Sequence, residues 1–332
     1  MSSPLLSVVI PVYNEAAGLQ ALFDRLYPAL DALRIGYEVI FVNDGSRDKS
    51  AAMLKDQFNA RPDVTRVVFF NANYGQHLAI LAGFERVRGE RIVTLDADLQ
   101  NPPEEIHKLL AAMDQGADYV GGVRRVREDS WWRRSASRLM NRLRERITRI
   151  RMTDQGCMLR AYSRDIVDAV AAAREVSTFI PALAYTFAHH PVEVDVMHEE
   201  RAAGESKYSM YRLIRLNFDL ITGFSLVPLQ LFSVAGMIVA LTSVVLYVVV
   251  IAQRAIIGGF VEGIKAFWDR DILAFFLIGL IMFGVGLLGE YVGRIYQQVR
   301  DRPRYVIRAV LERDEEASLP PHPGVESVRL IR

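Results

Sequence analysis

The stretch that decides the fold runs from residue 91 to residue 100 and reads Arg91-Ile92-Val93-Thr94-Leu95-Asp96-Ala97-Asp98-Leu99-Gln100. Its apolar first half predicts a buried strand, and Asn101-Pro102-Pro103 turns the chain directly afterwards. The strand is therefore expected to end in two carboxylates and a carboxamide, which are the hard oxygen ligands that Mg²⁺ or Mn²⁺ prefers. An Asp-x-Asp pair alone is weak evidence, because most such pairs are solvated loop residues. The pair gains weight only if other polar loops lie beside it.

Alternating strands and helices lead up to this stretch. Strands are expected at residues 5–12, 37–42, 64–70 and 91–95, with helices at 14–30, 49–58 and 76–87 between them. This alternation predicts an α/β fold with a parallel sheet, in which ligands bind at the carboxyl ends of the strands. A polar loop follows each of those ends, at residues 11–15, 44–46, 71–77 and 96–100. The four converging loops predict a single metal-dependent site for a nucleotide sugar.

The second half of the predicted domain is rich in arginine. A strand is expected at residues 118–123, a helix at 131–150, a turn at 153–157, helical segments from there to 188, an edge strand at 191–197 and a polar loop at 199–206. Eleven arginines lie between Arg124 and Arg151 against three acids, which makes a local positive region. The whole chain is balanced, with 40 Lys and Arg against 39 Asp and Glu, so no nucleic-acid partner is expected.

The single cysteine, Cys157, excludes an intrachain disulfide and indicates a reducing compartment. It is expected to be a buried structural thiol rather than a nucleophile. The amino terminus has no cationic start, and Pro11 interrupts its apolar run, so no signal peptide is expected. The catalytic domain is therefore predicted to be cytosolic and to span residues 1–206.

Two uncharged stretches follow, at residues 226–252 and 272–289, and the second can be extended if Glu290 lies near an interface and pairs with Arg294. Their lengths are close to or above the ~20 apolar residues that cross a bilayer. Residues 226–293 are therefore predicted to hold two transmembrane helices and a short external loop. Eight Lys and Arg flank the two stretches against three between them, which places both flanks and both chain ends in the cytoplasm.

The sequence also predicts the structure of the segments on either side of these two stretches. Residues 207–225 are amphipathic and predict a juxtamembrane helix, either among anionic lipid headgroups or packed on the catalytic domain. Residues 294–332 begin as a basic cytosolic segment, and the part beyond Arg313 is expected to be disordered. The G-x-G-x-x-G motif at 284–289 lies inside an apolar stretch, so helix–helix contact explains it better than dinucleotide binding. Two such helices per chain predict a homo-oligomer through the membrane region.

Five motifs relate the chain to a known family. They are Val9-Ile10-Pro11-Val12-Tyr13-Asn14-Glu15, Val42-Asn43-Asp44-Gly45-Ser46, Asn73-Tyr74-Gly75-Gln76-His77, Asp96-Ala97-Asp98-Leu99-Gln100-Asn101-Pro102-Pro103-Glu104 and Gly204-Glu205-Ser206-Lys207-Tyr208. With a further segment at 286–305, they resemble the family 2 glycosyltransferases with the GT-A fold, and specifically the polyprenyl-phosphate glycosyltransferases. The resemblance covers residues 5–310. It implies a Rossmann-like, mostly parallel catalytic sheet that binds a UDP-sugar, followed by two transmembrane helices in the bacterial inner membrane.

The resemblance also implies roles for individual residues. The donor nucleotide would be held by Pro11, Tyr13, Glu15, Asp44 and Asp96. The metal, Mg²⁺ or Mn²⁺, would be bound by Asp96, Asp98 and Gln100, and Asp98 would also be catalytic. The acceptor phosphate would be bound by Arg124, Arg133, Arg201, Ser206 and Lys207. Two alternatives stay open: Arg134 can replace Arg133 in the match, and Asp44 can be a turn residue before Gly45.

Asp154 matches the position of a catalytic base in inverting relatives. The acceptor is a phosphate monoester that is mostly a dianion at neutral pH, so a base is not strictly required. Asp154 is therefore expected either to deprotonate or orient the acceptor, or to pair with arginines of the preceding helix. His77 is expected either to contact the sugar or to have a structural role.

Two motifs narrow the family further. Residues 73–84 and 154–162 look most like the members that transfer 4-deoxy-4-formamido-L-arabinose from UDP to undecaprenyl phosphate, for lipid A modification and polymyxin resistance. A bactoprenol glucosyltransferase or a polyprenol-phosphate mannosyltransferase is the alternative within the family. A membrane-anchored nucleotide-sugar-binding scaffold without turnover is the alternative outside it.

Overall fold

The computed structural model describes residues 4–124, 152–154, 156–173, 179–199, 266–299 and 303–313, together with short helical pieces between 227 and 245. The chain divides into two compact units. The first comprises Met1–Leu139, Ile150–Lys207 and Arg302–Arg332, and the second comprises Met140–Arg149 and Tyr208–Asp301. The described residues 303–313 therefore belong with the N-terminal unit, although they lie near the other end of the sequence.

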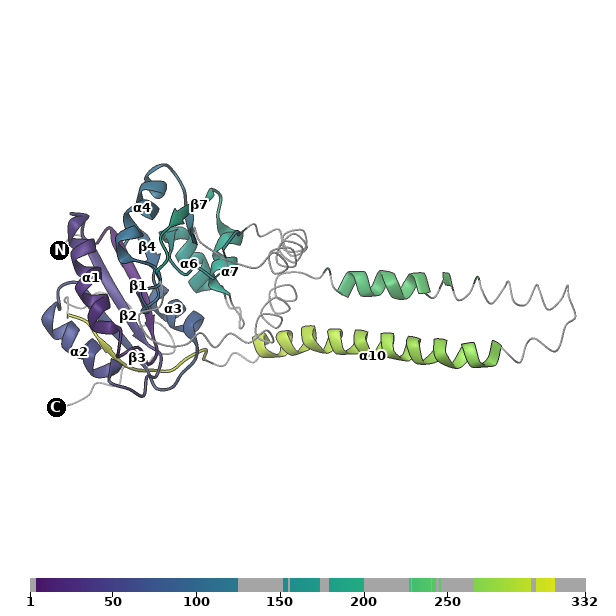
Figure 1. Cartoon of the computed structure of the whole chain (residues 1–332). Coiled ribbons are helices and arrows are strands. Elements are labelled where there is room, and N and C mark those ends of the chain that lie inside the picture. The colour runs from purple at the N-terminus through teal and green to yellow at the C-terminus, as the bar shows by residue number, and fades with distance from the viewer. Residues whose placement is uncertain are drawn as a thin grey trace, which may run out of the picture. The chain divides into compact units, whose positions relative to one another are not determined.

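An eight-stranded mixed sheet forms the centre of the first unit, in the order β7-β5-β6-β4-β1-β2-β3-β8 (Figure 1). Its strands are β1 (Leu6–Val12), β2 (Tyr37–Asn43), β3 (Thr65–Phe70), β4 (Arg91–Thr94), β5 (Tyr119–Arg124), β6 (Arg160–Ser163), β7 (Pro191–Val196) and β8 (Ile307–Leu311). β1 pairs in parallel with β2 and β4, β2 with β3, and β5 with β7, whereas β6 and β8 run antiparallel to their neighbours. The predicted α/β class and the parallel arrangement of the first four strands are confirmed.

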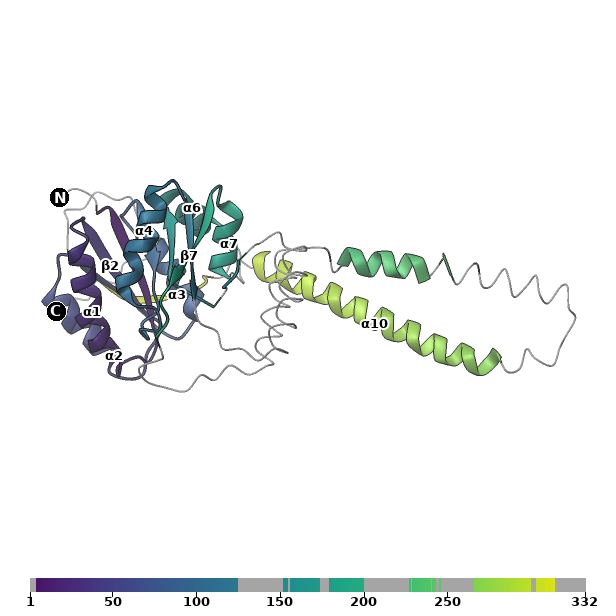
Figure 2. The ribbon, with the colours of Figure 1, turned by 45° about the horizontal axis from the view of Figure 1, so that its top comes forward.

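Helices cover both faces of this sheet (Figure 2). One face carries α1 (Leu19–Ala32), α2 (Ser50–Ala60), the 3-10 helix η1 (Pro103–Glu105) and α4 (Ile106–Asp114), and the other carries α3 (Gln76–Phe84), α6 (Arg164–Ala172) and α7 (Ile180–Phe187). β1 separates two apolar layers, because Val8 and Leu26 of α1 join one core cluster while Val9 meets α3. A Cβ added to Gly83 of α3 would lie 2.3 Å from Val9 Cγ1, so the helix packs directly on the strand.

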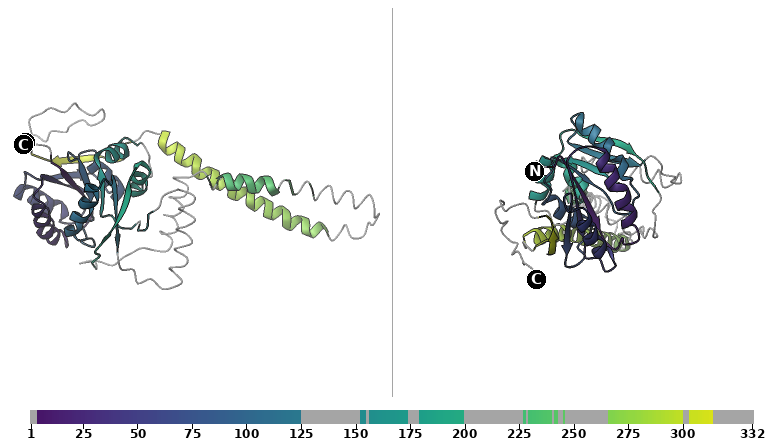
Figure 3. Two further views of the ribbon diagram at one scale, coloured as in Figure 1. Left: turned by 90° about the horizontal axis from the view of Figure 1, so that it is seen from above. Right: turned by 90° about the vertical axis from the view of Figure 1, so that its left-hand side faces the viewer.

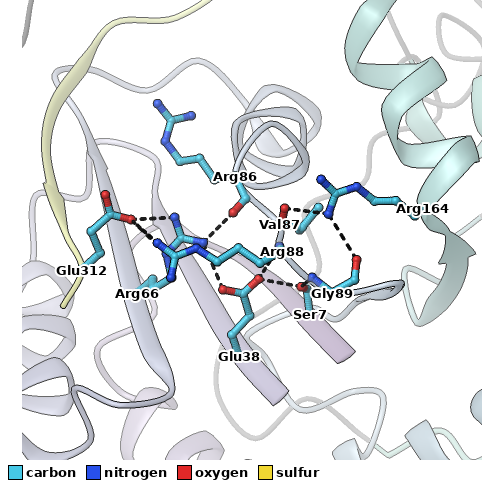
Figure 4. Close-up of polar contacts among 9 residues, drawn as sticks. All are labelled: Ser7, Glu38, Arg66, Arg86, Val87, Arg88, Gly89, Arg164 and Glu312. Carbon is cyan, nitrogen blue, oxygen red and sulfur yellow. Dashed lines mark hydrogen bonds and ion pairs between the residues drawn. The ribbon is translucent and has the colours of Figure 1, made fainter. Parts of the chain in front are cut away.

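A buried polar network lies at the amino ends of the strands (Figure 4). Arg66 of β3 donates to Glu38 Oε2 at 3.0 Å and to Glu312 Oε2 at 2.6 Å. The second oxygen of Glu38 accepts hydrogen bonds from Ser7 Oγ at 2.7 Å and from the Arg88 amide at 2.6 Å. A buried carboxylate needs such compensation, and here it ties β1, β2, β3 and the end of β8 together.

The sequence does not predict β6 and β8. β6 lies where helical segments are expected, so that part of the prediction is wrong. It has only four residues and begins with Arg160, whose side chain is fully buried, so it shows neither the length nor the alternation of a recognisable strand. β8 also has few residues and lies in the predicted basic segment, and it is recognisable only through its pairing with β3 (Figure 3).

The second unit contains α10 (Ala266–Val299) and helical residues between 227 and 245. The ring of Phe232 covers Gly284 of α10, where an added Cβ would lie 2.0 Å from the ring. The packing predicted for the motif at 284–289 is thus present at Gly284, but at Gly286 and Gly289 no described atom lies within 4 Å of an added Cβ, so the prediction is not confirmed at those two positions. Within the part of the chain that the structure describes, no helix combines the length and the apolar character that a membrane crossing requires. The predicted helices at 131–150 and 207–225 and the tail beyond Arg313 lie outside the described residues.

Candidate functional site

The loops that follow β1 and β2 are joined by hydrogen bonds. The Asp44 amide donates to Val12 O at 2.9 Å, and the Asn14 amide donates to Ser46 Oγ at 3.0 Å. Two predicted nucleotide residues lie on the first of these loops or just before it: Pro11 is partly buried and pairs with Val42 in the sheet, and Tyr13 is 43% exposed. A large exposed aromatic ring at the carboxyl end of a buried strand is available for contact with a planar ligand.

Asp44 organises the loop that follows β3. Its Oδ1 accepts a hydrogen bond from the Tyr74 amide at 2.6 Å, and its Oδ2 accepts from the Gly75 amide and from Asn73 Nδ2, both at 2.9 Å. Burial raises the pKa of Asp44, and the amides of Tyr74 and Gly75 oppose that rise because they stabilise the carboxylate. Three donors leave room for a further donor on a carboxylate, which has about four lone-pair sites.

The turn after β2 is made by Asn43 and Gly45 rather than by the Asp44 side chain. Asn43 Oδ1 accepts a hydrogen bond from the Ser46 amide at 2.9 Å. Gly45 has φ +67°, and an added Cβ would lie 2.4 Å from the carbonyl carbon of Ala72. The described contacts therefore assign Asp44 to the 73–75 loop and not to the turn that the sequence left open as an alternative.

The three residues predicted to bind a metal share one side of the chain after β4. Asp96, Asp98 and Gln100 are partly exposed, whereas Ala97 and Leu99 between them are buried. Leu99 holds this turn with φ +59°, a left-handed conformation that is unusual for leucine and that is often found at functional sites. The alternation turns three oxygen-bearing side chains away from the core.

The oxygen atoms predicted to bind the metal are few, and hydrogen bonds already orient two of the side chains that carry them. Asp96 Oδ1 accepts a hydrogen bond from Gln76 Nε2 at 2.5 Å, and Asp98 Oδ1 accepts one from the Gln100 amide at 3.2 Å. Among the described residues, no three His, Cys, Asp or Glu side chains gather closely enough to hold a metal ion by themselves. Two carboxylates and an amide suit Mg²⁺ or Mn²⁺ in a site that substrate phosphate and water complete.

Asp154 and Arg124 form one pair. Arg124 Nε donates to Asp154 Oδ2 at 2.6 Å and Nη2 donates to Oδ1 at 2.8 Å. Burial alone would raise the pKa of Asp154, but the Arg124 guanidinium and the Gly156 amide outweigh burial, and the pKa is lowered. Among the described residues, the partner of Asp154 is therefore an arginine of β5, which the sequence assigned to phosphate binding, and the arginines of the predicted helix at 131–150 lie outside the described part of the chain.

A second arginine fixes the turn that carries Asp154. The Arg160 guanidinium is fully buried and donates to the carbonyl oxygens of Asp154 and Cys157, at 2.5 and 2.8 Å, and to Tyr119 Oη at 2.5 Å. Burial raises the pKa of the Cys157 thiol to about 11. The prediction of a buried cysteine is confirmed, and a thiol with a raised pKa is a poor nucleophile.

His77 lies on the first turn of α3, next to Gln76. Its ring meets the edge of Phe179 with the ring centroids 5.2 Å apart, and its buried Nδ1 has no hydrogen-bond partner among the described residues. Burial lowers the pKa of His77 to about 4, so its ring is neutral near pH 7. The ring therefore carries no charge that would attract a phosphate group.

Sequence reasoning located the loop at 71–77 but missed what its backbone does. Asp44 is positioned by the amides of Tyr74 and Gly75 and by the side chain of Asn73, and Asp96 is positioned by the side chain of Gln76. In the sequence, the only indication of these roles is that the loop follows a buried strand. Glu15, which the sequence assigned to the nucleotide, has its amide bonded to Ser50 Oγ at 3.0 Å. Four of the predicted acceptor residues lie outside the described residues, namely Arg133, Arg201, Ser206 and Lys207.

Known proteins are similar in sequence to this chain over most of its length. The model of glycosyl transferase family 2 matches residues 7–171. The undecaprenyl-phosphate 4-deoxy-4-formamido-L-arabinose transferase of Serratia proteamaculans (strain 568) is 50% identical over 305 residues, covering 92% of this chain and 93% of that protein. The protein of the same name from Aeromonas hydrophila is 47% identical over 313 residues, covering 92% and 94%. A solved structure of glucosyl-3-phosphoglycerate synthase from Mycobacterium tuberculosis is 17% identical, with a TM-score of 0.45 over 66% of this chain and 78% of that chain.

Proposed function

Because the chain belongs to glycosyl transferase family 2, we propose that it transfers 4-deoxy-4-formamido-L-arabinose from a UDP donor to undecaprenyl phosphate. One observation at the site carries the proposal. A single loop holds Asp44 through the amides of Tyr74 and Gly75, and holds Asp96 through Gln76. The carboxylate assigned to the nucleotide and the carboxylate assigned to the metal are thus set by the same few residues.

The donor nucleotide would lie against the ends of β1 and β2. Asp44 would accept a hydrogen bond from the uracil or the ribose, since a carboxylate with three donors can take one more. Tyr13 would supply its exposed ring, and Pro11 and Glu15 would complete the edge of the site. These contacts bind the nucleotide and leave the sugar to face the carboxyl end of β4.

Asp96, Asp98 and Gln100 would hold Mg²⁺ or Mn²⁺ together with the diphosphate. When bound, the cation supplies Lewis-acid stabilisation of the negative charge that develops on departing UDP. Gln76 would orient Asp96 as a ligand, because a donated hydrogen bond fixes the direction of the carboxylate.

The transfer would be a single displacement with inversion at the anomeric carbon. An oxygen of the acceptor phosphate attacks that carbon, and the bond from the carbon to the β-phosphate oxygen of UDP breaks. The acceptor phosphate, with a second pKa near 6, is mostly a dianion at neutral pH and can attack without losing a proton. Asp154 would then serve to hold Arg124 in place, since it is paired and its pKa is lowered.

The acceptor phosphate would be bound by cations. Arg124 is one, and Arg133, Arg201 and Lys207 are proposed as others from their residue types and their place in the sequence, while the neutral hydroxyl of Ser206 would donate a hydrogen bond to the phosphate. Arginine suits bidentate phosphate contact and lysine supplies a compact charge. Without such groups, a dianionic acceptor would be repelled by the donor diphosphate.

We also propose that residues 226–293 anchor the chain in the inner membrane, with the catalytic unit and both ends in the cytoplasm. The two uncharged stretches support this, as do the apolar side chains that α10 exposes, such as Ile281, Met282 and Val285. A lipid-linked acceptor needs a catalytic unit close to the bilayer surface. Contact between copies in the membrane would make the protein a homo-oligomer.

The test is transfer of sugar to undecaprenyl phosphate by purified full-length protein, with a panel of UDP-sugars. Formation of lipid-linked product from UDP-4-deoxy-4-formamido-L-arabinose alone, dependent on a divalent metal, is expected. Asp98→Ala should abolish the product, whereas Asp114→Ala should not, because Asp114 pairs with Arg91 at the opposite end of β4. Product from UDP-glucose or from a mannosyl donor instead would show that the assigned sugar is wrong. Binding of UDP without any product would show that the protein is a nucleotide-sugar-binding scaffold rather than an enzyme.

A further inference from the structure

The chain returns to the first unit after α10, and residues 303–313 add the edge strand β8 to the sheet. β8 runs antiparallel to β3, with Leu311 opposite Val67 and Ala309 opposite Phe69. The register shifts between Phe69 and Phe70, where β3 passes into the loop at 71–77. The C-terminal segment therefore meets the site loop at the point where that loop begins.

Two contacts connect the start of this segment to the loop. Val306 O accepts a hydrogen bond from the Asn71 amide at 3.1 Å. The ring of Tyr305 stacks on Phe70, with centroids 4.9 Å apart and an angle of 17° between the planes, and its hydroxyl donates to the Glu85 carboxylate. Phe70 is only 4% exposed, so Tyr305 covers one face of a buried ring.

The same buried ring supports the backbone that holds Asp44. Phe70 meets the ring of Tyr74 edge to face, with centroids 5.6 Å apart, and Tyr74 Oη donates to Asn71 Oδ1 at 2.8 Å. The Tyr74 amide donates in turn to Asp44 Oδ1. An unbroken series of contacts thus runs from Tyr305 through Phe70 and Tyr74 to Asp44.

The other end of β8 is fixed separately. Glu312 accepts hydrogen bonds from Arg66, which is buried against Glu38 (Figure 4). Leu311 packs against the main core and pairs with Val67, away from the loop. A substitution at Leu311 therefore tests the packing of the strand, whereas a substitution at Tyr305 tests the support of the loop.

We propose that Tyr305 is a positioning residue for the donor-nucleotide site, through which the C-terminal segment holds residues 71–75 in the conformation that presents Asp44. The inference rests on the proposed role of Asp44 in nucleotide binding. Its physical basis is that the loop at 71–75 packs on the buried ring of Phe70, so a side chain that holds this ring in place also restricts the conformations of the loop. The segment that follows the predicted membrane helices thus completes the catalytic unit and sets its affinity for the donor.

The first test compares full-length Tyr305→Ala with Leu311→Ala, which removes packing from the same strand at the far end. Tyr305→Ala should raise the Kd for UDP by about three- to tenfold, as expected for loss of an aromatic contact, whereas Leu311→Ala should lower the melting temperature without changing that Kd. Tyr305→Phe keeps the ring and should restore wild-type affinity. An unchanged Kd for UDP in Tyr305→Ala, or equal losses of affinity in both alanine variants, would overturn the proposal.

Hydrogen exchange supplies a readout that needs no ligand. The amides of Tyr74 and Gly75 should exchange faster in Tyr305→Ala than in the wild type, and should be unaffected by Leu311→Ala. If Asp44→Asn binds UDP as tightly as the wild type, the proposed nucleotide role of Asp44 fails, yet faster exchange at 71–75 would still establish the support of the loop. Unchanged exchange in Tyr305→Ala would instead reject that support.

Discussion

The guanidinium of Arg124 holds both carboxylate oxygens of Asp154, at 2.6 and 2.8 Å. The sequence assigns the two residues to different tasks, Arg124 to the acceptor phosphate and Asp154 to proton transfer, to orienting the acceptor, or to pairing with arginines of the preceding helix. In the structure the pair is a unit, and a carboxylate whose pKa is lowered is a weak base near neutral pH. The geometry therefore favours an orienting role for Asp154 over proton transfer.

Asp154→Asn should reduce kcat by about 10- to 100-fold through misplacement of Arg124, and should lower the free energy of unfolding by about 3 kcal/mol at pH 7. Because the folded-state pKa of Asp154 is lowered, its stabilisation is complete above the unfolded carboxyl pKa of about 3.9 and is lost as the pH falls through the folded value. Denaturant unfolding at pH 7 and pH 3 should therefore show a smaller difference between variant and wild type at the lower pH.

The matched control is Asp168→Asn, which removes an exposed pair with Arg164 on α6 and should change stability by no more than about 0.5 kcal/mol. If Asp154→Asn removes an acidic limb from the pH profile of kcat and leaves stability intact, Asp154 acts as a base and the orienting role is wrong.

Gln76→Ala should weaken Mn²⁺ binding in the presence of UDP by about tenfold, because the Gln76 side chain orients the carboxylate of Asp96. At saturating metal, kcat should change little, since the ligands themselves remain. Electron paramagnetic resonance of free Mn²⁺ gives the affinity directly. Gln20→Ala is the control, since it breaks a similar Gln–Asp hydrogen bond, to Asp24, on the exposed side of α1. Equal Mn²⁺ affinity in Gln76→Ala and wild type would remove Gln76 from the metal site.

Gly45→Ala tests the turn that delivers Asp44. Gly45 and Gly116 both have positive φ, at +67° and +97°, but only Gly45 has a neighbour in the way, since its added Cβ would lie 2.4 Å from Ala72 whereas Gly116 has nothing within 4 Å. Gly116→Ala should cost about 1 kcal/mol of stability from backbone strain alone. Gly45→Ala should cost more than about 3 kcal/mol and should weaken UDP binding. Equal costs in the two variants would show that the backbone at Ala72 moves aside easily.

The sequence predicts those parts of the site that depend on a local pattern. Strands β1 to β4 are long or strongly apolar, and the partly exposed residues Asp96, Asp98 and Gln100 directly follow such a buried strand. What it does not reveal depends on distant contacts. The Arg124–Asp154 pair joins β5 to a turn 30 residues later, and the stacking of Tyr305 on Phe70 joins the C-terminal segment to the end of β3. Neither residue type nor spacing carries information about such pairings, which arise only when the sheet is assembled.

Cys157 gives a prediction at alkaline pH. Burial raises the pKa of its thiol to about 11, above the unfolded value of about 8.5. The folded state therefore binds the proton more tightly, and the stability contributed by the buried thiol is complete below pH 8.5 and is lost as the pH rises toward 11. Wild type should lose stability more steeply than Cys157→Ala over that interval, although the variant starts lower because it leaves a small cavity in the core.

The same burial predicts slow chemistry at the thiol. Iodoacetamide at pH 8 should modify Cys157 only after denaturation, because the thiolate is the reactive form and is scarce in the folded protein. Rapid modification of the native protein would contradict burial of the thiol between Asn101 and Leu159, whose oxygens are its nearest polar contacts. It would also contradict the packing of the turn in which Arg160 donates to the carbonyl oxygens of Asp154 and Cys157. The orienting role of Asp154 depends on that turn and would then lose its support.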